Sequence, residues 1–508
     1  MSLCLTWLRL LEYMQVLYFG MSQLDCLAMP SLPSNIQDQR CDQSVCALLG
    51  EAMNHVLKME VRGRVAEMVC RDYAWISDLY IIDYWIDELW DKLPSSLKQL
   101  EVLEDSEWAN VLDETVCLAL RNPLPLSILC LRRLLSSYSL CNQSYHEMNL
   151  FLGLSDEEWT RYSSMTVYDK RGVKEKKRGE IERIVPLVRV MKDRSGFSTL
   201  VDIGAGLGHL TRALASSLPE LRVKSVEGCE SFVKRAAELD VKRRGEGVER
   251  VFSWVDQNTK IGDDDSVGVC LSGLHACGDL SPSILRLSSA QPTVSSCLLF
   301  SCCYHKLNGG MDKLFRQEWE GVEDRVVECR GFPMSDRFKE CTLSYAAREL
   351  ACHSKYMFIK QMRSQNPPVH THHALRALAE MLIVRVGGRR HEGLRGGGGE
   401  EKVEAYLEKA LAGHSQLRDD VFRVLNAQHF LSSSLPSLVE NSTRRLVTLY
   451  CLRLLIAPFV EDLILLDRLQ FLREQGWNAS IHKLFDPVQS PRCYAIMGLR
   501  STVPCDDK

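Results

Sequence analysis

The chain has 508 residues, of which 45% are hydrophobic and 25% charged, an ordinary globular composition that gives room for two to four domains. Its net charge of −4 excludes a protein that is basic overall, so any contact with nucleic acid or an anionic membrane requires a local patch. The 20 cysteines include no CxxC pair, which disfavours a zinc ribbon.

Residues 1–20, MSLCLTWLRLLEYMQVLYFG, are apolar but lack the basic beginning of a secretory signal. Arg9 and Glu12 interrupt them, which favours an amphipathic helix over a cleaved signal or an anchor. We therefore expect an intracellular protein, in the cytoplasm or nucleus and not secreted, with most thiols reduced. Residues 1–50 are interpreted as a variable or poorly ordered N-terminus.

Residues 51–165 are interpreted as a helical N-terminal region. The segments 77–93 and 124–140 have apolar residues at helical spacing, and Pro94 follows the first of them. Neither carries a catalytic pattern, so both are expected to form core. The helical regions also offer surfaces for a protein partner.

A basic run, DKRGVKEKKRGEIERI, occupies residues 169–184. Such a run is either a solvated helix face or a segment that contacts phosphates or covers a cofactor. Under the second interpretation, Lys176 and Lys177 are candidates for contact with the substrate.

Strand and helix signals alternate through residues 166–310, which predicts a doubly wound parallel sheet. The expected strands lie within 197–206, 221–228, 248–256, 267–280 and 292–307, and the expected helices within 209–218 and 232–243.

The loop after the first strand reads Asp202-x-Gly204-x-Gly206-x-Gly208. A dinucleotide loop is G-x-G-x-x-G, but its third glycine position is His209 here. Glycines remove the Cβ that would block a ligand, and an acid at the strand end can hold a ligand's amino group. The spacing therefore favours S-adenosylmethionine as the cofactor, although a tight turn alone also explains the glycines.

Two further acids follow the next strands. Glu227 ends the second strand, where an acid can accept both ribose hydroxyls, and Asp256 ends the third, where it can reach an adenine amino group. With Asp202 they form a cofactor-binding constellation at one sheet edge. The alternative is a rim of exposed acids.

The segment after the fourth strand, LSGLHACGDL, faces the transferable methyl group in such a sheet. His275 and Asp279 are therefore the catalytic candidates, as a proton acceptor or a hydrogen-bond acceptor. The Pro-Pro-aromatic motif of adenine dimethylases is absent, so adenine is not supported as the acceptor.

The fifth strand ends in FSCCYHKL. Tyr304 is a weak catalytic candidate that either stacks on a base or caps the core. Cys302, Cys303 and His305 are candidates for substrate contact, although core thiols are the simpler interpretation of the cysteines. A metal shared with Cys277 is a further alternative, but the spacing is not clustered, and no metal is assigned.

Residues 311–445 are expected to form a mostly helical insertion with a flexible Gly-rich loop at 391–401. Residues 446–508 complete the chain with a helix at 455–476 and strands at 479–485 and 492–499. A terminal helix and hairpin is how the seven-stranded methyltransferase sheet ends. The predicted fold is therefore α/β, with a class I, Rossmann-like methyltransferase domain.

Residues 450–469 are as long and nearly as apolar as a membrane-spanning helix, but they carry five charges. Each charge costs about 3 kcal/mol at mid-bilayer. We expect a soluble helix with one apolar face and no stable membrane insertion.

The motifs VDIGAGLGHL, VKSVEG, GLHACGDLS, CCYHKL and APFVEDLILLDRLQFLREQGW make residues 75–500 resemble the methyltransferase-like 25 family. The resemblance implies a class I, S-adenosylmethionine-dependent fold and implicates the three glycines, Glu227 and the loop of His275 and Asp279. The family's Pro-Lys-Lys-x-His-Glu element reads EKKRGE at 175–180, without the proline and the histidine.

Two hypotheses follow. The first is an active methyltransferase with RNA favoured as its substrate, protein or a small molecule as alternatives, and DNA not expected. The second is a catalytically inactive scaffold that binds S-adenosylmethionine and holds a partner through its helical regions.

Overall fold

The computed structural model describes residues 43–118, 121, 123–143, 148, 152, 154–243, 247–256, 258–260, 268–308, 331–364, 369–391, 402–427 and 429–500. The expectations for residues 1–42 and 392–401 lie outside these ranges. The chain divides into two compact units, residues 1–64 and 65–508. Helix α2 (Gln43–Asp72) begins in the first unit and ends in the second. No described helix is both long and apolar enough to cross a membrane.

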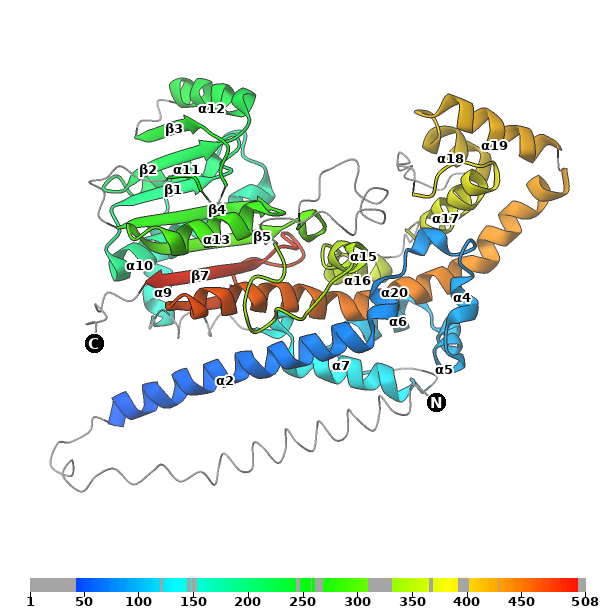
Figure 1. Cartoon of the computed structure of the whole chain (residues 1–508), viewed down its shortest axis with the longest axis horizontal. Helices are drawn as coiled ribbons and strands as arrows, with labels where there is room; N and C mark the ends of the chain where they lie inside the picture. Colours follow the sequence, from blue (N-terminus) through cyan, green and yellow to red (C-terminus); the bar gives the residue numbers. More distant parts are fainter. Residues whose placement is uncertain are drawn as a thin grey trace. The chain divides into compact units, whose positions relative to one another are not determined.

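A seven-stranded sheet forms the centre of the second unit, in the order β3-β2-β1-β4-β5-β7-β6 among the described residues (Figure 1). Strands β1 to β5 pair in parallel, and β7 runs antiparallel to both β5 and β6. The strands are β1 (Thr199–Ile203), β2 (Arg222–Glu227), β3 (Val248–Phe252), β4 (Val269–Cys277), β5 (Val294–Cys302), β6 (Trp477–Lys483) and β7 (Tyr494–Arg500). This topology confirms the predicted class I α/β fold.

Helices cover both faces of the sheet because the strand order reverses between β1 and β4. Right-handed crossovers then place the helices of β1–β3 on one face and the helix between β4 and β5 on the other. Helix α10 packs against α11, and α13 packs against α20. Every residue of β1 is buried, as a central parallel strand requires. The covering helices are α10 (Glu175–Ser195), α11 (His209–Ser217), α12 (Glu230–Arg243), α13 (Leu280–Ala290) and α20 (His429–Glu474).

Short helices form the predicted N-terminal helical region. They are α3 (Ala74–Ser77), 3₁₀ helix η1 (Ile81–Asp83), α4 (Leu89–Lys92), α5 (Ser95–Lys98), η2 (Gln99–Val102), α6 (Asp105–Leu112), α7 (Leu126–Tyr138), η3 (Leu140–Asn142) and α9 (Asp156–Ser164). The single helix expected at 77–93 is wrong, because Glu88 has a left-handed backbone (φ 50°) that separates η1 from α4.

More helices follow β5 and its short 3₁₀ helix η4 (Tyr304–Lys306): α15 (Tyr345–Leu350), α16 (Lys355–Arg363), α17 (Val369–Arg385), α18 (Val403–Ala410) and α19 (Ser415–Ala427). The boundary expected between residues 445 and 446 lies inside α20, which has 46 residues. Helix α20 contacts α17 and α6 as well as β6 and β7, so one helix serves both the helical region and the sheet.

The five charges in the second half of α20 are buried, so this helix does not have the single apolar face that we expected. They bind other parts of the second unit. Asp467 accepts hydrogen bonds from the backbone N–H groups of Met334 and Ser335, and Asp462 accepts one from Leu140. These contacts position the segment after β5 and the start of η3 on the helix.

Candidate functional site

The loop from β1 to α11 lies where the parallel strands end. Gly204, Gly206 and Gly208 have φ angles of 74°, 55° and 68°, which residues with side chains rarely adopt. A Cβ at Gly208 would collide with the guanidinium group of Arg250, whereas a Cβ at Gly206 would meet no described atom within 4 Å. Gly206 therefore borders open space at this edge.

Glu227, the last residue of β2, crosses to this loop. Its Oε2 accepts a hydrogen bond from the backbone N–H of Gly206 at 2.8 Å, and its Oε1 accepts one from Cys229 at 2.9 Å. The carboxylate thus lies beside the open position at Gly206.

Asp202 lies in β1, just before the loop, and only 2% of its surface is exposed. Its Oδ1 has no hydrogen-bond partner among the described residues. Burial raises the pKa of this carboxyl to about 7, Lys177 and Arg250 oppose the rise, and Glu227 adds to it. A buried oxygen without a donor costs about 1–3 kcal/mol, which a ligand's ammonium group can offset.

Asp256 does not end the third strand, because β3 ends at Phe252. Its exposed Oδ1 accepts hydrogen bonds from the backbone N–H of Asn258 and from Thr259 Oγ1, each at 2.9 Å. These bonds lower the pKa of Asp256, Thr259 contributing most. The carboxylate therefore caps a local turn.

Glu180 of α10 is a site residue that the sequence analysis did not select. Its side chain is 1% exposed, lies 3.2 Å from Nε2 of His275 and accepts a hydrogen bond from Ser490 at 2.8 Å. Lys176 and Lys177 lie within 3.8 and 3.6 Å of its oxygens. Burial works to raise the pKa of Glu180, but His275 above all, with Lys177 and Ser490, lowers it to about 2. The final glutamate of EKKRGE was the one sequence signal for it.

His275 reaches Glu180 because β4 is irregular at this point. The pairing of β4 with β5 shifts register between Leu274 and Ala276, and His275 has a left-handed backbone with φ of 65°. Such a bulge redirects a side chain, and a left-handed non-glycine residue is a strained position often found at functional sites. His275 is thereby held against α10.

Lys177 lies between the two acids of this edge. It pairs with Glu180, and both Glu180 and Asp202 raise its pKa against the stronger lowering effect of burial. Lys177 thus compensates buried negative charge, and its contact with the substrate stays a prediction.

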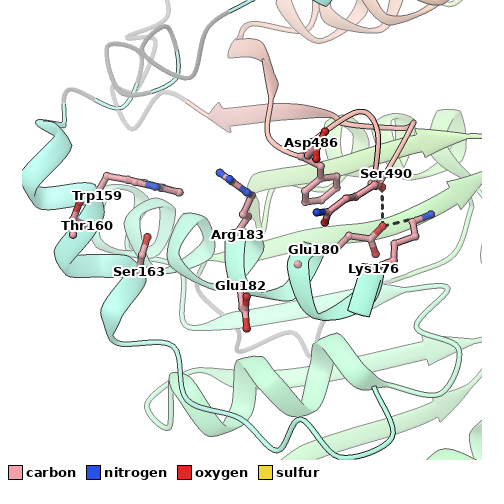
Figure 2. Close-up of a pocket in the computed structure, with 12 residues that line it drawn as sticks. Trp159, Thr160, Ser163, Lys176, Glu180, Glu182, Arg183, Asp486 and Ser490 are labelled. Carbon is pink, nitrogen blue, oxygen red and sulfur yellow. Dashed lines mark hydrogen bonds and ion pairs between the residues drawn. The ribbon is translucent and has the colours of Figure 1, made fainter. Parts of the chain in front are cut away.

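A cavity of about 590 Å³ opens beside Glu180 (Figure 2). Helix α9, helix α10 and the loop 484–493 between β6 and β7 line it. Figure 2 shows Trp159 at one end and Glu180 at the other, between Ser490 and Lys176. Gly179, which stands at the missing histidine of the family element, also lines the cavity. Glu180 therefore lines the cavity and also contacts His275.

Two candidates at the ends of β4 and β5 have structural contacts. Asp279 accepts a hydrogen bond from the backbone N–H of Asn308 at 2.9 Å. Tyr304 is 1% exposed and donates to Glu461 at 3.0 Å, with Arg468 and Arg492 beside its ring. Of the two alternatives for Tyr304, the enclosed ring fits the one in which it caps the core.

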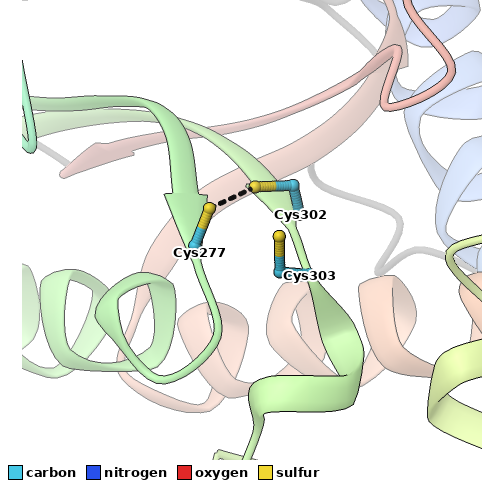
Figure 3. A group of neighbouring side chains, drawn as sticks. All are labelled: Cys277, Cys302 and Cys303. Carbon is cyan, nitrogen blue, oxygen red and sulfur yellow. Dashed lines mark hydrogen bonds between the residues drawn. The ribbon is translucent and has the colours of Figure 1, made fainter. Parts of the chain in front are cut away.

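The cysteines at this edge lie together, although their spacing in the sequence disfavoured a cluster. The Sγ atoms of Cys277, Cys302 and Cys303 lie within 4.8 Å of one another (Figure 3). The ring of His305 contacts a different cysteine: its Nδ1 lies 3.5 Å from Sγ of Cys352.

Residues 176–310 match a family model described as a methyltransferase domain. "Probable methyltransferase-like protein 25" of Homo sapiens is 31% identical over 242 residues, which cover 45% of this chain and 36% of that protein. Its Mus musculus counterpart is 31% identical over 266 residues, covering 50% and 41%. The chain thus spans about two fifths of the length of these relatives.

Solved structures match part of the chain. One is an O-methyltransferase of neocarzinostatin biosynthesis in complex with S-adenosyl-L-homocysteine. It is 22% identical, the match covers 22% of this chain and 36% of that chain, and the TM-score is 0.18. The PH0226 protein of Pyrococcus horikoshii OT3 has 15% identity, covers 29% and 66%, and has a TM-score of 0.21.

Proposed function

We propose that this chain, which is similar to methyltransferase-like protein 25, is a methyltransferase that uses S-adenosylmethionine. One observation carries the proposal: Asp202 presents an unpartnered, buried carboxylate oxygen beside a glycine loop that Glu227 also contacts. The cofactor supplies an electrophilic methyl group. The chain's own residues have to bind it and align an acceptor.

The residues at this edge fit the parts of that cofactor. Asp202 would accept hydrogen bonds from the amino group, and Glu227 would accept them from the ribose hydroxyls. Trp254, 82% exposed and packed over Gly228, would offer its ring to the adenine. The acceptor would enter the cavity of Figure 2, because that cavity shares Glu180 with His275.

Gly206→Arg is expected to weaken S-adenosylmethionine binding at least about tenfold. The new side chain would occupy the open space beside the loop, and the left-handed backbone would add strain of roughly 1 kcal/mol. Isothermal titration calorimetry of both proteins measures the effect. Absence of binding heat from the unsubstituted protein would contradict the proposed function.

Glu227→Ala is expected to weaken binding by about 1–3 kcal/mol, the worth of hydrogen bonds to a charged group. Glu249→Ala is the matched control, because Glu249 lies on the neighbouring strand and pairs with Lys224. Equal affinities in the two variants would show that Glu227 does not hold the ribose.

RNA stays the predicted acceptor class. The basic run before β1 is the local patch that could contact its phosphates. Lys170 pairs with Glu182 at 2.6 Å and Arg171 with Asp169 at 3.0 Å, so part of the run's charge is already balanced. Tritiated methyl transfer to total RNA and to whole lysate separates the classes. Label in protein alone would exclude RNA, and binding without transfer to any fraction would favour the inactive scaffold.

A further inference from the structure

Three thiols meet at the ends of β4 and β5, outside the proposed cofactor contacts. Parallel pairing sets Cys277 directly beside Cys302, and their Sγ atoms are 2.9 Å apart. Figure 3 shows the sulfur of Cys303 directed towards the same point. Cys277 is exposed, Cys303 half-buried and Cys302 buried, so the cluster is open on one side.

The backbone at Cys303 explains how consecutive cysteines face one point. Successive side chains of a strand alternate between its faces, so Cys302 and Cys303 would normally diverge. Cys303 has φ of 51°, a left-handed conformation that residues other than glycine rarely adopt. The turn from strand to 3₁₀ helix η4 at this residue brings the second sulfur back to the first.

Three sulfur atoms that lie within 4.8 Å of one another suit a thiophilic cation. The thiolate, and not the thiol, is the form that binds metals. The thiols therefore release their protons when a metal binds.

A second group of ligand-type side chains shows the contrast. Asp83, Glu380 and His391 also lie within 4.8 Å of one another among the described residues. There, however, Nε2 of His391 lies 2.7 Å from Asp83, and Arg390 lies 3.3 Å from the same carboxylate. Arg390 thus already balances the charge of Asp83, and His391 hydrogen-bonds to it, whereas Cys277 and Cys302 contact each other.

We propose that Cys277, Cys302 and Cys303 form a binding site for a thiophilic divalent cation, with Zn²⁺ as the expected ion. Thiolates select such ions over Mg²⁺ or Ca²⁺. Zinc bonds to sulfur at about 2.3 Å, so tetrahedral ligands lie about 3.8 Å apart, and Cys277 needs only a small rotation away from Cys302. Three protein ligands leave a fourth position for water or a substrate atom on the side that Cys277 leaves open.

The test uses the full chain, reduced and stripped of metal. Titration with Cd²⁺, followed by the ultraviolet sulfur-to-cadmium charge-transfer band, is expected to show one ion whose affinity falls roughly tenfold or more in Cys277→Ser and in Cys303→Ser. Zn²⁺ should displace the band. Cys229→Ser is the matched control, because Cys229 is also partly exposed and lies on the loop after β2.

Each contrary result has a defined meaning. Because Cys277 is exposed, its serine variant should keep the melting temperature of the unsubstituted protein, so a lost band there reports a lost ligand. An unchanged band in both cluster variants would overturn the proposal. So would a Cys277–Cys302 disulfide, detected by mass spectrometry after mild oxidation, in a protein that binds no Cd²⁺ when reduced. None of these readouts depends on methyl transfer.

Discussion

Asp202→Asn is expected to stabilise the cofactor-free protein above pH 7 and to weaken cofactor binding at the same time. Burial raises the pKa of Asp202 from 3.8 to about 7, so between these values the folded state holds a proton that the unfolded chain releases. Stability therefore falls as pH rises through this window, by on the order of 4 kcal/mol for a fully buried group. Asparagine has no such penalty.

Urea unfolding at pH 5 and pH 8 measures the first effect, and calorimetry with S-adenosylmethionine measures the second. The unsubstituted protein should lose more stability than Asp202→Asn between the two pH values. Asp256→Asn is the control, because Asp256 is exposed and caps a turn. Parallel pH profiles for the unsubstituted protein and Asp202→Asn would contradict the expectation.

Glu180→Gln is expected to destabilise the protein by about 3 kcal/mol at pH 7. The pKa of Glu180 is lowered from 4.5 to about 2, so its contribution is fully present above pH 4.5 and is lost as pH falls through 2. Glutamine keeps the size of the side chain but leaves Lys177 without its partner charge.

The difference in unfolding free energy between the unsubstituted protein and Glu180→Gln should therefore shrink between pH 4.5 and pH 2. Glu182→Gln provides the control, since Glu182 lines the same cavity on the same helix but pairs with Lys170 at the surface. A difference that stays constant across this range would assign the effect to packing.

The sheet could be predicted because its determinants are local. Apolar runs, glycines and alternation fix β1 to β5, and the terminal hairpin identifies the antiparallel end. The positions of Asp202 and Glu227 beside the glycine loop could be predicted, because parallel strands all end at one edge of the sheet. The turn around Asp256 was not predicted, because no residue in the sequence signals that β3 ends at Phe252.

The contacts across the site could not be predicted, because they depend on backbone irregularities and on distant segments. Glu180 meets His275 only through the register shift in β4, and it meets Ser490 only because the loop before β7 returns to this edge. The thiol cluster likewise depends on the left-handed backbone of Cys303. The two alternatives for Tyr304 could not be separated from sequence, because Glu461 and Arg468 reach it from the distant helix α20.

Helix α20 makes the helical region and the sheet inseparable as folding units. Its first half packs on α17, and its second half lies against β6 and carries the buried Asp467 that binds the segment after β5. A protease cut within His429–Glu474 would leave neither fragment with a complete hydrophobic interior. Gene truncations that spare only the strands should accordingly yield insoluble protein.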